Sequence, residues 1–89
     1  MVESTVKIMN KLGLHARAAA LLVQTSSKFS SEVTIEKDGV EVNGKSIMGL
    51  MMLAAAKGAH VIVRADGSDE GEALAGIEKL IADKFNEGV

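Results

Sequence analysis

Residues 32–43 read EVTIEKDGVEVN, two runs of alternating apolar and polar residues on either side of an Asp-Gly pair. Alternation with a period of two is typical of a half-buried strand. Asp38-Gly39 accepts the positive φ angles of a tight turn, so this stretch predicts a β-hairpin. The hairpin in turn indicates an antiparallel sheet.

The segments on both sides of the hairpin supply the remaining elements. Upstream, residues 5–8 alternate as a short strand, and the alanines at 18–20 favour a helix over 16–27. Downstream, Ser46 is a helix N-cap before the crowded apolar run 47–53, and residues 60–65 form a strand rich in Val and Ile. Asp69 and Glu72 have capping-box spacing at the start of the last helix. Its apolar stripe consists of Leu74, Ile77, Ile81 and Phe85.

The resulting order is βαββαβα, which predicts an α+β fold of two layers with the helices on one face of the sheet. The 89 residues suffice for one domain, residues 1–89. A formal net charge of −2 and only two aromatic residues argue against nucleic-acid binding. The chain has no cysteine and no His, Asp or Glu at ligand spacing near His15, so we expect no metal site. No segment resembles a secretion signal or a membrane span, and we expect a cytoplasmic protein.

His15 lies where the first loop meets the first helix, in the stretch Gly13-Leu14-His15-Ala16-Arg17. A helix N-terminus presents unpaired backbone N–H groups and the positive end of the helix dipole, so it binds anions. The backbone of Ala16 and Arg17 and the guanidinium of Arg17 could therefore hold a phosphoryl group on His15. Taken alone, a histidine beside one arginine is more often a plain loop or capping residue, and His60 in its strand is expected to be structural.

Ser46 and the residues after it allow two interpretations. On local pattern Ser46 is a helix cap, but a phosphate there would add a charge of about −2 at a helix start and repel an acidic partner. The apolar residues of the short helix are usually core, yet so short a helix cannot bury every face. We therefore expect a docking surface of Leu14, Ile47, Met48 and Met51.

The stretches NKLGLHAR at residues 10–17 and NGKSIMGLM at 43–51 resemble the two signatures of HPr, the histidine-containing phosphocarrier family of the bacterial phosphotransferase system. The resemblance covers essentially the whole chain and implies an open-faced β-sandwich of four antiparallel strands and three helices. It implies that Nδ1 of His15 accepts a phosphoryl group from enzyme I and passes it to the A component of a sugar permease, with Arg17 steadying the group. It further implies phosphorylation of Ser46 by an HPr kinase/phosphorylase, and a monomeric carrier without cofactor rather than a turnover enzyme.

One residue departs from the family pattern, because Ala18 stands where His-Ala-Arg is commonly followed by Pro. Alanine favours helix, so we expect the helix to start unchanged, while the physiological acceptor stays open. The alternatives are a carrier of the nitrogen-related branch, a regulatory binding protein controlled through Ser46, and an unrelated α+β ligand-binding domain. The last would require both signatures to be accidental.

Overall fold

The computed structural model describes residues 1–86, so residues 87–89 of the expected domain lie outside the described part. The strands are β1 Val2–Lys7, β2 Glu32–Lys37, β3 Val40–Asn43 and β4 His60–Asp66. The helices are α1 Ala16–Ser26, α2 Ile47–Met52 and α3 Glu70–Ala82, followed by a short 3-10 turn, η1 Lys84–Asn86. The expected order of strands and helices is confirmed, and only η1 is an addition to it.

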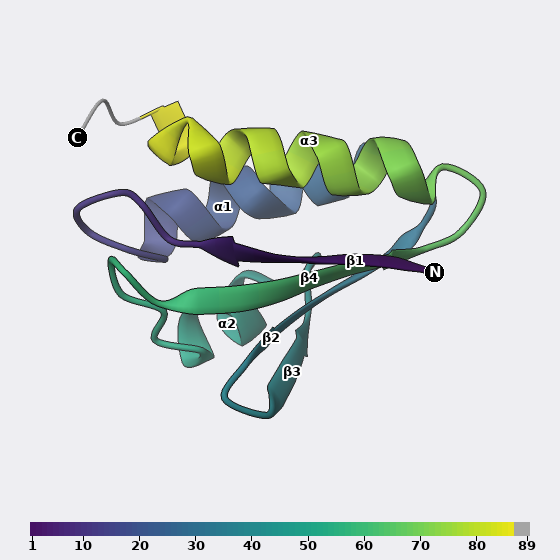
Figure 1. Ribbon diagram of the computed structural model, residues 1–89. Helices are drawn as coiled ribbons and strands as arrows, with labels where there is room; N and C mark the ends of the chain where they lie inside the picture. Colours follow the sequence, from purple (N-terminus) through teal and green to yellow (C-terminus); the bar gives the residue numbers. More distant parts are fainter. Residues whose placement is uncertain (87–89) are drawn as a thin grey trace.

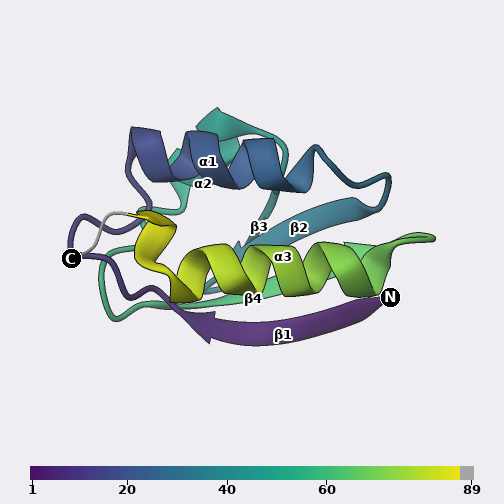
Figure 2. The same ribbon diagram turned by 90° about the horizontal axis from the view of Figure 1, so that it is seen from above.

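The strands form one antiparallel sheet in the order β1-β4-β2-β3. The predicted hairpin joins β2 and β3, with Lys37 opposite Val40 across the Asp38-Gly39 turn. β1 lies at the opposite edge and pairs only with β4, placing Val6 opposite Val61. Helices α1 and α3 cover one face of the sheet and run side by side, while α2 packs against α1 and β3 (Figures 1 and 2). The α+β, open-faced fold predicted from the sequence is thus confirmed.

The core lies between the inner face of the sheet and helices α1 and α3. Ile35 and Val63 are fully buried on adjacent strands, and Leu22 and Ile77 are buried in α1 and α3. The expected stripe of the last helix needs one correction, because Phe85 does not lie on α3. Phe85 is buried from η1, where it and both its neighbours have positive φ angles. The chain turns back after α3 to bring this ring into the core.

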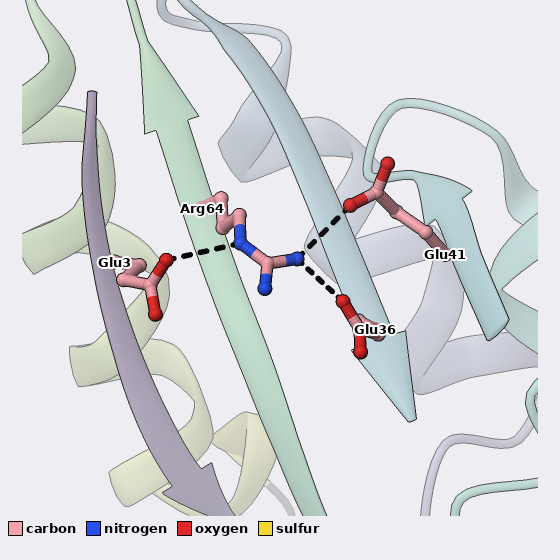
Figure 3. A network of polar contacts seen from close by, with 4 residues as sticks. All are labelled: Glu3, Glu36, Glu41 and Arg64. Atoms are coloured by element: carbon pink, nitrogen blue, oxygen red, sulfur yellow. Dashed lines mark hydrogen bonds and ion pairs between the residues drawn. The ribbon is translucent and has the colours of Figure 1, made fainter. Parts of the chain in front are cut away.

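The outer face of the sheet is polar, as the alternation predicts, and Arg64 of β4 lies at its centre (Figure 3). Nε of Arg64 donates to Glu3 of β1 at 3.1 Å, and Nη1 donates to Glu36 at 2.6 Å and to Glu41 at 2.9 Å. Hydrogen bonding to Glu36, and then to Glu3, raises the pKa of Arg64 above its ordinary value. One side chain therefore links all four strands, since Glu36 belongs to β2 and Glu41 to β3.

The start of α3 differs from the capping box that the sequence predicts. Asp69 is the N-cap residue, but its carboxylate makes no capping hydrogen bond. It instead accepts hydrogen bonds from the backbone N–H groups of Ser30 and Ser31 and from the Ser31 hydroxyl. The hydrogen bond from the Ser31 hydroxyl, followed by the one from Ser30 N–H, lowers the pKa of Asp69 to about 2. The Asp69 carboxylate is therefore bonded to the loop after α1 instead of capping α3, and it links that loop to the start of α3.

Candidate functional site

His15 is the N-cap residue of α1, as the sequence predicts. Its backbone is extended, with φ −81° and ψ 179°, and its carbonyl accepts from Ala19 N–H at 2.8 Å. The His15 side chain makes no capping hydrogen bond. The first-turn N–H groups of α1 therefore receive no cap from the imidazole ring, and such groups at a helix start bind anions.

Arg17 follows His15 in the first turn of α1 and is exposed to solvent. The whole of α1 is described, and its first turn contains no acidic residue. The positive end of the helix dipole is therefore not offset by a carboxylate, and the guanidinium adds a charge that pairs well with phosphate oxygens. This arrangement suits a dianionic group on His15, although the roles of His15, Arg17 and the backbone of Ala16 remain predictions.

The distribution of acidic residues along the chain also bears on the site, although no sequence motif points to it. Residues 4–31 and 42–65 contain no Asp or Glu, and all twelve acidic residues lie outside these two stretches. The two stretches include all of α1 and α2 and the loop before His15. These two stretches, which contain His15 and Ser46, therefore carry a net positive charge. Such a charge favours the binding of anionic groups and of partners with acidic surfaces.

Ser46 is the N-cap of α2, and this prediction is confirmed by a hydrogen bond that its Oγ accepts from Gly49 N–H at 3.1 Å. α2 buries only Leu50 and leaves Ile47, Met48 and Met51 exposed, as expected of a docking surface. Met52 is also exposed, which was not predicted.

The expectation for Leu14 has to be corrected, because this side chain is only 6% exposed and belongs to the core. Its N–H donates to the Ala55 carbonyl at 2.8 Å, which draws the end of the loop against the segment after α2. The exposed apolar residue of the loop is instead Leu12, which is 66% exposed. We use the name docking surface for the exposed apolar residues Leu12, Ile47, Met48, Met51 and Met52, whose role in docking stays a prediction.

The two signature segments meet in space. Gly13 packs so closely on the segment after α2 that an added Cβ would lie 2.5 Å from the Ala55 carbonyl oxygen and 2.9 Å from Ala56 Cα. α1 also packs against α2. The loop before His15 and the segment after α2 thus form one continuous region, and His60 lies at the start of β4, exposed and opposite Lys7.

Two further features are absent from residues 1–86. None of the helices in this range combines the length and apolar composition that crossing a membrane requires. The same residues include no group of three or more His, Cys, Asp or Glu side chains placed to hold a metal ion.

Comparisons with known proteins agree on one family. The family model described as "PTS HPr component phosphorylation site" matches residues 2–83. Phosphocarrier protein HPr of Neisseria meningitidis serogroup B is 53% identical over 88 residues, 99% of each chain. HPr-like protein Crh of Bacillus subtilis is 54% identical over 82 residues, 92% of this chain and 93% of Crh. The crystal structure of HPr-C-His from Thermoanaerobacter tengcongensis superimposes with a TM-score of 0.96 at 53% identity, covering all of both chains.

Proposed function

The chain belongs to the PTS HPr family of phosphocarriers, and from this premise we propose that it accepts a phosphoryl group on His15 from phosphorylated enzyme I and donates it to the A component of a sugar permease. The observation that carries the proposal is the position of His15 at the N-cap of α1, a helix whose first turn contains Arg17 and no acidic residue. The helix N-terminus can therefore bind the phosphoryl group that the ring carries. We further propose that residues 1–89 act as one domain and that the protein is a cytoplasmic monomer.

Transfer needs a neutral imidazole, because only an unprotonated ring nitrogen has a lone pair with which to attack phosphorus. The lone pair of Nδ1 attacks phosphorus, an N–P bond forms, and the bond from phosphorus to its donor atom on enzyme I breaks. The backbone N–H groups of Ala16 and Arg17 and the Arg17 guanidinium stabilise the charge on the three phosphoryl oxygens in flight. The same step runs in reverse when the acceptor takes the group, so His15 is regenerated and the protein acts as a carrier rather than as a turnover enzyme.

The docking surface provides the apolar contact with both partners. Met48 and Met52 are flexible side chains that adapt to different surfaces, which suits a carrier that meets two proteins in turn. The absence of acidic residues from the two stretches around His15 and Ser46 favours partners with acidic surfaces. Such contacts must be brief, so we expect interfaces at the small end of the range, below about 1,200 Å².

Ser46 is proposed as a regulatory site for an HPr kinase/phosphorylase. A phosphate on Oγ could still accept from Gly49 N–H at the start of α2, so the helix would tolerate it. The added charge of about −2 would stand directly beside Ile47 on the docking surface and repel an acidic partner. Phosphorylation would thus weaken docking without unfolding α2.

The test combines the purified protein with phosphoenolpyruvate and enzyme I and maps the bound phosphoryl group by mass spectrometry. We expect one acid-labile group on His15, lost in His15→Ala and retained in His60→Ala, which removes the other histidine of the chain. Arg17→Ala should slow transfer without abolishing it, and Ser46→Asp should raise the KM for enzyme I. A phosphoryl group mapped elsewhere, or full activity of His15→Ala, would refute the proposal.

A second candidate, a regulatory binding protein controlled through Ser46, is favoured by the comparable similarity to HPr-like protein Crh. The two candidates differ in the phosphoryl donor, since the regulatory one requires ATP and a kinase. If enzyme I leaves His15 unmodified while a kinase labels Ser46 from ATP, the second candidate is correct. Pairing with purified acceptors then separates sugar transport from the nitrogen-related branch, because both use His15.

A further inference from the structure

The loop that leads to His15 is anchored at both ends to one segment of the chain. At its start, Ile8 N–H donates to the Ala59 carbonyl at 2.8 Å, and Gly58 N–H donates back to the Ile8 carbonyl at 2.8 Å. At its end, Leu14 N–H donates to the Ala55 carbonyl, also at 2.8 Å. Between these anchors the backbone must turn before it enters α1.

Asn10 stabilises this turn with two hydrogen bonds to Gly13. Its side-chain Nδ2 donates to the Gly13 carbonyl at 2.7 Å, and its own carbonyl accepts from Gly13 N–H at 3.2 Å. The Asn10 side chain is fully buried, whereas its neighbours Met9 and Lys11 are exposed. A buried amide inside a loop indicates a specific polar requirement, because burying it without hydrogen bonds is unfavourable.

The bond from Asn10 fixes the Gly13–Leu14 peptide, which is separated from the N-cap residue His15 by Leu14 alone. The Gly13–Leu14 peptide has its oxygen bonded to Asn10 Nδ2 and its N–H bonded to the Ala55 carbonyl. Both polar groups of that peptide are therefore held, one by the loop itself and one by the segment after α2. With this plane held and the Leu14 side chain buried in the core, the path by which the chain enters the N-cap is constrained.

We propose that Asn10 is a positioning residue for His15, acting through the Gly13 carbonyl on the direction in which the imidazole leaves the start of α1. This inference rests on the proposed function and extends it to a residue that touches no substrate. Reacting groups must be aligned closely for transfer, so a small rotation of the ring slows the chemical step while leaving partner docking unaffected. Asn10 should therefore affect kcat and leave KM almost unchanged.

The test compares Asn10→Asp and Asn10→Ala with Ile77→Val, a core change in α3 that lowers stability and removes none of the loop's hydrogen bonds. Asp has the size of Asn, but its carboxylate cannot donate to the Gly13 carbonyl. We expect both Asn10 variants to lose about tenfold in kcat for phosphorylation by enzyme I, with KM within about twofold in Asn10→Ala, which adds no charge. The Ile77→Val variant should keep both constants. Less than a twofold change in kcat in the folded Asn10 variants, or an equal loss in Ile77→Val, would overturn the proposal.

A readout free of any partner separates this inference from the proposed function. The ring resonances of His15, followed by NMR, should move in both Asn10 variants, while those of His60 should not. If wild type transfers no phosphoryl group, the proposed function fails, and the NMR comparison still decides the role of Asn10. If the variants do not fold, the wild type supplies the test: phosphorylating His15 should shift the Asn10 side-chain amide resonances and leave those of Gln24, further along α1, in place. Unshifted Asn10 resonances would overturn the proposal.

Discussion

Replacing Gly13 by Ala should destabilise the protein far more than replacing Gly39 by Ala, although both glycines have positive φ. Gly13 has φ +66° and Gly39 has φ +83°. For a residue with a Cβ, the left-handed conformation is unfavourable by about 1–2 kcal/mol, partly offset by about 0.4–1 kcal/mol of reduced freedom in the unfolded chain. Conformation alone therefore predicts a loss of about 1 kcal/mol at either position.

The surroundings of the two glycines make the difference. No atom lies within 4 Å of a Cβ built on Gly39, whereas a Cβ on Gly13 would lie 2.5 Å from the Ala55 carbonyl oxygen and 2.9 Å from Ala56 Cα. Both of these are backbone atoms, so relief requires the loop to move and the Leu14 N–H to Ala55 hydrogen bond to break. Leaving its buried groups unpaired adds about 1–3 kcal/mol, which brings the loss for Gly13→Ala to about 3 kcal/mol.

The assay is urea unfolding followed by circular dichroism, with the free energy of unfolding taken from the midpoint and slope of each curve. Gly13→Ala should lose about 2 kcal/mol more than Gly39→Ala at an unchanged slope. Equal losses in the two variants would refute the reasoning, since they would mean that the close approach of the loop to Ala55 contributes nothing.

Three further predictions concern other parts of the fold. Ala54 has φ +51°, so Ala54→Gly should relieve the left-handed strain and raise the free energy of unfolding by about 0.5–1 kcal/mol, measured in urea. Phe85→Ala should lower the free energy of unfolding by about 3–4 kcal/mol because this ring is fully buried, whereas Phe29→Ala, at a partly exposed ring, should lose much less in the same urea assay. The pKa of Asp69 is lowered from 3.8 to about 2. The stabilisation that its ionised carboxylate contributes is therefore nearly complete above about pH 4 and is lost as the pH falls towards about 2. Asp69→Asn should therefore be less stable than wild type at pH 7 and lose less between pH 4 and pH 2; parallel pH curves would contradict this role of Asp69.

Sequence patterns predicted the parts of the fold that local chemistry decides. The Asp38-Gly39 turn and the Ser46 cap depend on residues within a few positions of each other, and both occur as predicted. The strand order does not follow from such patterns, because alternation says which face a residue occupies and not which strand lies beside it. Nothing near β1 indicates that its partner is β4, some fifty residues further along.

The corrections share a tertiary cause. Asp69 has the spacing of a capping box, but Ser30 and Ser31 arrive from another loop and supply better donors. Leu14 lies in a loop without periodicity, so its burial could not be read from a pattern.

For the site, the onset of α1 was enough to place His15 at a helix N-terminus. The turn from Asn10 to Gly13 that precedes His15 was not predicted, although an Asn three residues before a Gly is typical of a turn.

The pairing of β1 with β4 has a consequence for how the protein is made. On the ribosome, β1 is synthesised first but has no partner until residues 60–66 have emerged, so the sheet cannot close while most of the chain is still being added. The chain contains no proline and no cysteine, which removes peptide-bond isomerisation and disulfide exchange as slow steps. Completion of the fold after synthesis is therefore governed by the search of one edge strand for its distant partner.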